Sequence, residues 1–283
     1  LVADTRCGLG ESPFWDETTG EIAWLDIEAG TMLRHRDGGE ISKVELAPEV
    51  TFAAMADDGG IVFADPRGVH HQTATGDLHS LAPSWLDPAS ARTNDGAVDA
   101  QGRIWVGSTT RARTRGTGEI GVVLEGDWQP RFHDLTLPNG IGWSPADDRI
   151  YYVDTLSGTL WRAPFDSTDG STGQPQPFFT LGRDRGLLDG LCVDETGAIW
   201  VAIWGGGVVI RIDEFGDVTT TVEVGASAVT SCAFAGTSLF ITTADPEGLD
   251  RVGVGGLYSV EVGVGGVPIA MASTRSQTPE NEP

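Results

Sequence analysis

Short apolar runs alternate with polar turns along almost the whole chain. The same arrangement occurs six times: an apolar run, a polar turn, and a second run rich in β-forming residues such as Ile, Val, Trp and Tyr. Two apolar runs around a short turn with Gly or Asp are typical of a β-hairpin. No longer stretch has apolar positions at helical spacing, so we expect little helix. The six copies lie at residues 12–26, 52–65, 95–108, 140–154, 190–203 and 231–244.

The spacing of these copies predicts the fold. The second run of consecutive copies begins 39 to 49 residues apart, at Ile22, Ile61, Ile104, Ile150, Ile199 and Leu239. A period of about 40–50 residues is that of a propeller blade, which contains four strands. We therefore predict an all-β fold, a six-bladed β-propeller with four-stranded antiparallel blades around a central channel.

The domain organisation follows from this repeat. With 283 residues, 40% of them hydrophobic, the chain is long enough for one large core. We assign residues 1–272 to a single propeller domain, in which residues 256–269 are expected to form the further strands that close the ring. Residues 273–283 are polar, and we expect them to be a frayed C-terminal tail.

Acids and amides recur at one position of the repeat. Counting back ten or eleven residues from the second run reaches Glu11, Asn94, Asn139 and Asp189. The first strand of each blade lines the channel of a propeller, so residues just before it meet at one mouth. A single Asn-Gly or Asp-Gly is more often an ordinary turn. Unrelated turns, however, do not require acids and amides at the same place, so the repetition predicts a site on the axis.

The chemistry of this set indicates a metal. Carboxylates that crowd together repel each other unless a cation neutralises them. Carboxylate and amide oxygens suit a hard divalent cation such as Ca²⁺, Mg²⁺ or Mn²⁺, and the absence of His and Cys at this position disfavours a closed structural zinc site. About three protein ligands leave coordination positions open to water and substrate, as metal-assisted hydrolysis requires.

Composition narrows the partners and the compartment. The net charge is −23 and Lys43 is the only lysine. Such a surface repels nucleic acid and anionic membranes, and no apolar run approaches the roughly 20 residues that cross a bilayer. Cys7, Cys192 and Cys232 lie far apart without paired spacing, which argues against a disulfide scaffold and favours a reducing compartment. We expect a cytoplasmic protein, a monomer or weak homo-oligomer, with neither nucleic-acid nor membrane partners.

Five ordered motifs resemble the gluconolactonase/regucalcin (senescence marker protein) family over about residues 5–270. They are LGESPFWD (9–16), RTNDGAVDAQGRIWVGS (92–108), LPNGIGWSPADDRIYYVDT (137–155), LLDGLCVDETGAIWVAIWGGG (187–207) and VTSCAFAGTSLFITTA (229–244). The resemblance implies a six-bladed propeller with one divalent metal that hydrolyses aldonolactones. It also implies that Glu11, Asn139 and Asp189 are metal ligands and that Arg92 and Asn94 contact the substrate. We expect Ca²⁺, with Zn²⁺, Mg²⁺, Mn²⁺ and Fe²⁺ as alternatives.

The chain departs from the family pattern in two places. The loop TTRARTRGTGEI (109–120) carries Arg111, Arg113 and Arg115 where family members often have acidic or small polar residues. These arginines either favour a substrate with a carboxylate or phosphate, or are solvated charges that balance an acidic surface. Leu188 stands where many members have Pro, which leaves the backbone there less restricted.

The implied reaction is carboxylic ester hydrolysis, the opening of a small sugar lactone to the free acid in carbohydrate metabolism. Asp189 is the predicted general base, and Arg92 and Asn94 are predicted to position the sugar. Asp95 would orient a metal-bound water or cap a turn, and Trp204 would either wall the pocket or fill the blade core. A GxSxG nucleophile elbow is absent from the sequence.

Two alternatives to lactonase activity stay open. One is a calcium-binding regulatory propeller without turnover, which an open coordination sphere disfavours because pure calcium sites usually have six to eight oxygen ligands. The other is a propeller hydrolase that acts on a different ester or on a phosphotriester.

Overall fold

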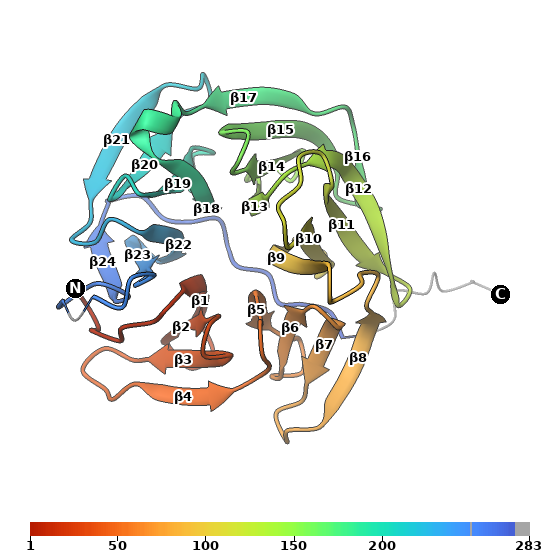
Figure 1. Ribbon diagram of the computed structural model, residues 1–283, viewed down its shortest axis with the longest axis horizontal. Helices are drawn as coiled ribbons and strands as arrows, with labels where there is room; N and C mark the ends of the chain where they lie inside the picture. Colours follow the sequence, from red (N-terminus) through yellow and green to blue (C-terminus); the bar gives the residue numbers. More distant parts are fainter. Residues whose placement is uncertain (250, 275–283) are drawn as a thin grey trace.

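Six antiparallel sheets form a closed ring in the computed structural model, which describes residues 1–249 and 251–274 (Figure 1). Each sheet has one strand next to the axis, and every neighbouring pair of these strands is in contact, including the last with the first. The predicted six-bladed β-propeller is therefore confirmed. The innermost strands are β1 (Gly10–Asp16), β5 (Phe52–Met55), β9 (Ala91–Val98), β13 (Pro138–Trp143), β18 (Leu187–Val193) and β22 (Val229–Ala235).

The first three blades have four strands each, in chain order from the axis outward. Blade 1 continues with β2 (Glu21–Asp26), β3 (Thr31–His35) and β4 (Ser42–Glu45). Blade 2 continues with β6 (Ile61–Asp65), β7 (Gly68–Gln72) and β8 (Leu78–Pro83). Blade 3 continues with β10 (Ile104–Thr110), β11 (Gly118–Leu124) and β12 (Asp127–Leu135).

The last three blades vary this plan. Blade 4 continues with β14 (Arg149–Asp154), β15 (Thr159–Asp166), β16 (Ser171–Thr172) and β17 (Gln176–Thr180), the last two both pairing with β15. Blade 5 is preceded by a short 3₁₀ turn, η1 (Arg183–Arg185), before β18, and continues with β19 (Ile199–Trp204), β20 (Val208–Ile212) and β21 (Val218–Glu223). Blade 6 continues with β23 (Ser238–Thr243) and β24 (Leu257–Glu261), so three strands of this blade are described. Ala3 forms a β-bridge with Leu257 of β24, so the N-terminal segment extends blade 6 at its outer edge.

The hydrophobic core lies between neighbouring blades. The cluster between blades 4 and 5, for example, joins Tyr151, Val153 and Leu160 to Leu188 and Ile199. Burial of each such large apolar side chain stabilises the fold by roughly 1.5–3 kcal/mol. Among the described residues, no helix has the length and hydropathy of a membrane span.

A buried aspartate organises the hairpin between the first two strands of blades 3 and 5. Asp99 accepts hydrogen bonds from the backbone N–H of Arg103 (3.0 Å), from Arg103 Nε (2.6 Å) and from Trp105 Nε1 (2.9 Å). Asp194 accepts the equivalent bonds from Ala198 N (3.0 Å) and Trp200 Nε1 (3.0 Å). Each carboxylate thus ties the turn to the indole that fills the blade.

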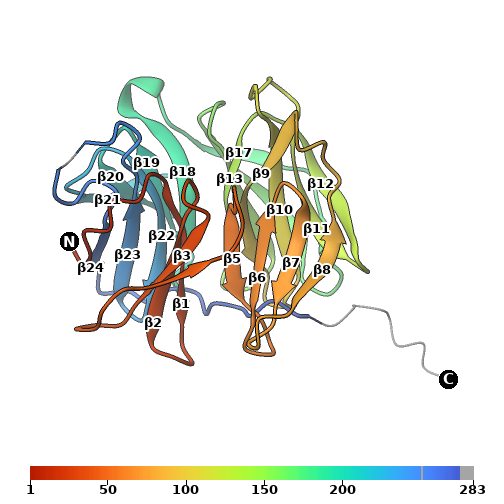
Figure 2. The same cartoon turned by 60° about the horizontal axis from the view of Figure 1, so that its bottom comes forward.

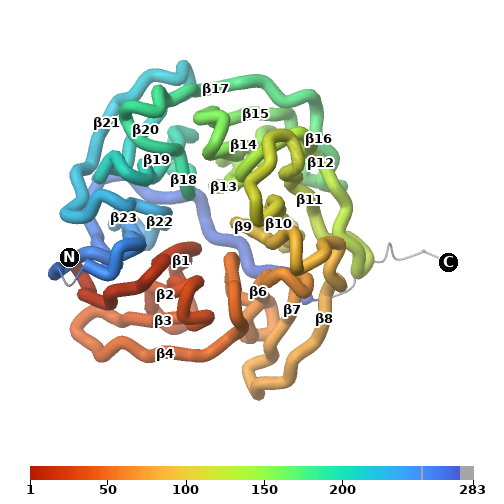
Figure 3. Tube along the Cα trace, in the orientation of Figure 1, coloured from red at the N-terminus to blue at the C-terminus, as the bar shows by residue number. Residues whose placement is uncertain are grey.

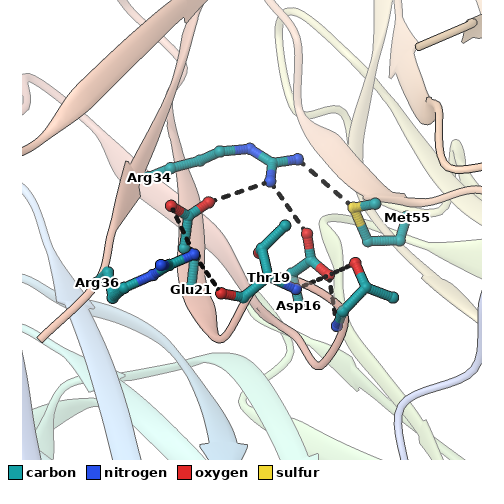
Figure 4. Close-up of polar contacts among 7 residues, drawn as sticks. Asp16, Thr19, Glu21, Arg34, Arg36 and Met55 are labelled. Carbon is teal, nitrogen blue, oxygen red and sulfur yellow. Dashed lines mark hydrogen bonds and ion pairs between the residues drawn. The ribbon is translucent and has the colours of Figure 1, made fainter.

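Blade 1 uses a variant of this arrangement (Figure 4). Asp16 accepts hydrogen bonds from the backbone N–H of Thr19 (3.3 Å) and, through its other oxygen, from Arg34 Nη1 (3.0 Å). Arg34 also reaches Glu21 and, across the junction with blade 2, Met55 Sδ at 3.5 Å. The arginine of the third strand therefore replaces the indole as the partner of the turn aspartate.

The segment after β24 crosses beneath the ring instead of forming more strands (Figures 2 and 3). Val267 N donates to Val193 O in blade 5 at 3.0 Å, and Ala272 N donates to Met55 O in blade 2 at 2.8 Å. We call residues 262–274 the closing segment. The prediction of strands over 256–269 is correct for 257–261 only. The residues after 261 instead form backbone hydrogen bonds with the lower ends of blades 5 and 2, whose strands are already paired.

The C-terminal tail predicted at 273–283 begins in contact with the ring. Ser273 N donates to Gly102 O at 2.8 Å, and Thr274 Oγ1 donates to Asp57 Oδ1 at 2.8 Å. Residues 275–283 lie outside the described residues.

The substitution Asp194→Ala should lower the free energy of unfolding by roughly 3 kcal/mol, because it leaves the half-buried Arg211 Nε and the buried Trp200 N–H without an acceptor. Burial raises the pKa of Asp194, but hydrogen bonds from Thr196, Trp200 and Arg211 outweigh this and lower it below the usual 3.8. The stabilisation is thus fully present above pH 3.8 and disappears as the pH falls through the lowered pKa. Urea unfolding at several pH values measures it.

Asp213→Ala is the matched control. Asp213 caps the last hairpin of the same blade, between β20 and β21, but accepts hydrogen bonds from backbone N–H groups only, those of Phe215 (3.0 Å) and Asp217 (2.9 Å). Its removal should cost about 1 kcal/mol. Equal losses for the two variants would contradict the assigned role of Asp194.

Candidate active site

The acids and amides singled out by the repeat lie at the upper end of the innermost strands, opposite the closing segment. Glu11, Asn139 and Asp189, with Asp95 beside Asn94, are between 6% and 9% exposed although all are polar. They come from blades 1, 3, 4 and 5, which are far apart in sequence. The structure therefore brings the predicted residues to one mouth of the channel.

β-Bulges place these residues. The pairing of the innermost strand with its neighbour slips by a residue in five of the six blades, and the register is regular only in blade 2. The slips occur next to Glu11, at Asn94 and Asp95, at Gly140 and at Asp189. A bulge leaves residues without a cross-strand partner and redirects their side chains. This local irregularity gives the mouth its polar groups.

The closest contact in the site joins Asn139 to Asp189. Asn139 Nδ2 donates to Asp189 Oδ1 and also to Thr155 Oγ1 (3.2 Å), while its Oδ1 accepts from Gly140 N (3.1 Å). Glu11 is held by Ser12 N, which donates to Glu11 Oε2 at 3.0 Å. The carboxyl group of Glu11 is thus held by the next residue, and that of Asp189 by the neighbouring blade.

The acidic groups perturb one another. Burial raises the pKa of Glu11 well above its usual range, and the nearby charges of Asp189 and Asp95 raise it further. Burial and Asp95 likewise raise the pKa of Asp189 well above normal, against the hydrogen bond from Asn139. Burial raises the pKa of Asp95 to about 6, although backbone N–H groups of Gly96 and Gly140 oppose it. A positive charge at this mouth would reduce the repulsion between these buried carboxylates.

A divalent cation fits this donor set. Carboxylate oxygens from Glu11 and Asp189 and an amide from Asn139 are hard ligands of the kind that Ca²⁺ and Mg²⁺ prefer. Among the described residues, no group of three or more His, Cys, Asp or Glu side chains is arranged to hold a metal ion. The set proposed from the sequence has only two acidic members and relies on an amide for the third, so its role as a ligand set stays a prediction.

The two residues predicted to contact the substrate lie on β9 at the same mouth. Asn94 Nδ2 donates to Pro138 O of blade 4 at 2.7 Å, which fixes its amide. Arg92 is half-buried and donates from Nη1 to Thr93 O at 2.9 Å. The structure therefore holds both side chains in place beside the acidic groups.

The other predicted residues divide between the mouth and the rim. Arg111 is exposed and forms a bidentate ion pair with Glu49, so its charge is already compensated. Arg113 is exposed in the loop between β10 and β11. Trp204 is half-buried, pairs with Leu187 in blade 5 and bridges to Ala228 of blade 6. Its contacts belong to the junction of two blades.

Sequence reasoning missed Ser12 and Glu49. Ser12 has a left-handed backbone (φ 48°), supports Glu11 through its N–H, and accepts a hydrogen bond from Ala53 N of blade 2 through Oγ. Ser12 directly follows Glu11, so its position in the repeat could have identified it from the sequence. Glu49 pairs with Arg111 across 62 residues, and no periodic signal connects the two.

A narrow cavity of about 200 Å³ continues down the axis below the site. It is lined by residues of all six blades and ends on the closing segment at Ile269. Cys192 and Cys232 face each other in its wall with their Sγ atoms 3.5 Å apart, and all three cysteines are free thiols. These two cysteines lie closer than their spacing in the sequence suggested.

Fold and site together define a six-bladed propeller with a buried mouth of carboxyl and amide groups at one end of its channel. Residues 9–245 match the model of the SMP-30/Gluconolactonase/LRE-like region, and the chain belongs to this family.

Several relatives are similar over almost their whole length. A putative sugar lactone lactonase, YvrE, from Bacillus subtilis is 30% identical over 95% of this chain and 98% of that protein. Pentonolactonase XacC from Haloferax volcanii is 31% identical over 90% of this chain and 88% of that protein. A crystal structure of regucalcin, described as a calcium-binding protein, from Agrobacterium tumefaciens superposes with a TM-score of 0.88 at 28% identity, covering 97% and 96% of the two chains.

The substitution Gly190→Ala should destabilise the protein by about 1–3 kcal/mol, because a Cβ at this position would lie 2.5 Å from Ser231 Cβ and 2.9 Å from Ser231 Cα. Because Gly190 follows Asp189, a shift of this strand away from Ser231 would also move the carboxylate. Thermal unfolding measures the loss.

A double-mutant comparison tests the cause. Ser231→Gly should restore part of the stability of Gly190→Ala, whereas Gly265→Ala, where a Cβ has no neighbour nearer than 3.4 Å, should have little effect. Strictly additive effects of the changes at 190 and 231 would rule out the overlap as the cause.

Proposed function

We propose that this protein is a divalent-metal-dependent hydrolase that opens the ring of a small sugar lactone to the free acid. The observation that supports this most is the meeting of Glu11, Asn139 and Asp189, from three blades, in a buried mouth beside Arg92 and Asn94. The names of the two curated relatives, a sugar lactone lactonase and a pentonolactonase, agree with it.

Glu11, Asn139 and Asp189 are the residues that would hold the ion. When bound, a divalent cation supplies Lewis-acid polarisation of a carbonyl and neutralises the buried acidic groups. Ca²⁺ is our first candidate, because one structural relative is described as calcium-binding.

The protein's own groups divide the remaining work. Asp189, which is buried in the mouth, accepts the proton of the water that attacks the lactone carbonyl and returns it to the ring oxygen as the bond between that oxygen and the carbonyl carbon breaks. Arg92 and Asn94 hold the sugar ring and its hydroxyl groups, and the Asn94–Pro138 hydrogen bond fixes the amide before substrate arrives. Asp95, which accepts a hydrogen bond from Gly96 N at 2.7 Å, orients water in the mouth.

Asp189→Asn should lower kcat for lactone hydrolysis by 10²-fold or more, the usual contribution of a general base. Acid release from neutral aldonolactones, followed with and without chelator, measures this effect and the metal dependence together. Asp213→Asn, a carboxylate change far from the mouth, should leave kcat unchanged. A near-normal kcat for Asp189→Asn would remove Asp189 from the role of base.

Divalent ions should raise the melting temperature of the chelator-treated protein, because an ion that binds only the folded state at 100 times its Kd stabilises it by about 2.7 kcal/mol. Glu11→Gln and Asn139→Ala should each weaken this response without abolishing folding. A calcium shift of equal size in wild type and in both variants would place the ion elsewhere. Scanning Ca²⁺, Mg²⁺, Mn²⁺, Zn²⁺ and Fe²⁺ ranks the metals.

A regulatory calcium-binding propeller without turnover is the second candidate, supported by several relatives named regucalcin at 28–29% identity. The same two assays separate the candidates. A calcium-dependent shift in melting temperature without hydrolysis of any lactone would favour the regulatory protein.

A further inference from the structure

Positive charge is concentrated at one edge of the mouth in an otherwise acidic protein. The chain has 18 Lys and Arg against 41 Asp and Glu, yet three arginines fall within residues 111–115. This loop starts beside Arg92, because Thr109 of β10 pairs with Arg92 of β9. The cations of the loop therefore extend from the substrate side of the proposed site.

The loop is held in a defined shape. Arg113 N donates to Thr110 O (2.8 Å), and Thr114 N donates to Thr110 Oγ1 (2.9 Å), which closes a tight turn with Arg113 at a φ of 51°. Thr117 Oγ1 donates to Thr114 O at 2.7 Å, and Gly116 N donates to Thr136 Oγ1 of the segment before blade 4. The turn thus presents its side chains from a fixed backbone.

Arg111 anchors the loop, and its charge is compensated. Its guanidinium donates to both carboxylate oxygens of Glu49 (2.6 and 2.8 Å) and to Pro88 O (2.9 Å). Arg113 differs from it, because its guanidinium has neither a hydrogen bond nor an ion pair within the described part of the chain. Arg113 is therefore an uncompensated cation at this edge, as is Arg115 two residues on.

Arg113 lies close enough to the site to act on it electrostatically. Burial lowers the pKa of Arg92, and the charge of Arg113 is the next cause, larger than the opposing effect of Glu49. Two guanidinium groups that repel each other at the edge of a ligand site form a natural receptor for an anion between them.

We propose that Arg92 and Arg113 form an anion-recognition pair that selects sugar lactones carrying a second, ionised carboxylate. This inference rests on the proposed lactonase function and names its substrate class. The acidic groups Glu11, Asp95 and Asp189 form the floor of the same mouth. They repel a dianionic phosphate more than a monoanionic carboxylate, which is why the pair suits the carboxylate.

The test compares two lactones that differ in one group. D-glucaro-1,4-lactone carries a carboxylate at C6, where D-glucono-1,4-lactone carries a hydroxymethyl group. The wild-type protein should hydrolyse the first with the higher kcat/KM. Arg113→Gln should lower kcat/KM for the acidic lactone about tenfold, the cost of one charge-assisted hydrogen bond, and change the neutral lactone less than about twofold.

Two further variants separate recognition from a structural effect. Arg113→Lys keeps the charge and should restore part of the preference for the acidic lactone. Arg115→Gln removes an exposed arginine of the same loop, two residues on, and should change neither lactone. Equal losses on both lactones with Arg113→Gln, or a wild-type preference for the neutral lactone, would overturn the proposal.

A binding measurement tests the inference independently of turnover. Isothermal titration with D-glucarate and D-gluconate, the product acids, should show tighter binding of the dianion, and Arg113→Gln should remove the difference. Equal binding of the two acids to the wild-type protein would overturn the pair as an anion receptor. Absence of hydrolysis of every lactone, with the binding difference retained, would instead refute the proposed function alone.

Discussion

Closure of the ring is the constraint on which the rest of this structure depends. No blade is stable alone, because its apolar faces are covered only by its neighbours. Polar contacts accompany this packing at the upper end of the channel. Thr51 Oγ1 meets Thr93 Oγ1 (2.8 Å) between blades 2 and 3, and Thr230 Oγ1 donates to Gly10 O (2.5 Å) between blades 6 and 1. The mouth of the channel is therefore also where neighbouring blades are joined.

The proposed site uses two of these junctions. Asn94 joins blade 3 to Pro138 of blade 4, and Asn139 joins blade 4 to Asp189 of blade 5. Three of the five side chains that would bind substrate and metal, those of Asn94, Asn139 and Asp189, are thus also contacts between blades. Such a site is rigid before any ligand arrives, since none of these side chains can rotate without breaking a blade contact.

The sequence predicted the fold and the meeting of the four principal site residues because both depend on the period of the repeat. Glu11 and Asp189 are 178 positions apart in number, yet each stands at the same place in its blade, so counting within the repeat was enough. Features that do not recur from blade to blade could not be predicted from the sequence. The path of residues 262–274 is decided by backbone groups left open under blades 2 and 5. The Glu49–Arg111 pair depends on two loops of unrelated length.

The charge of the protein and the charge of the mouth act over different distances. A net charge of −23 spread over the surface repels anions from afar, but this repulsion is screened beyond about 10 Å at 0.1 M salt. Arg92 and Arg113 act on a ligand already in the mouth, where burial of Arg92 reduces screening. An acidic surface and a receptor for anions are therefore compatible: the surface slows the approach of every anion, while the contact with two guanidinium groups decides which of them stays bound.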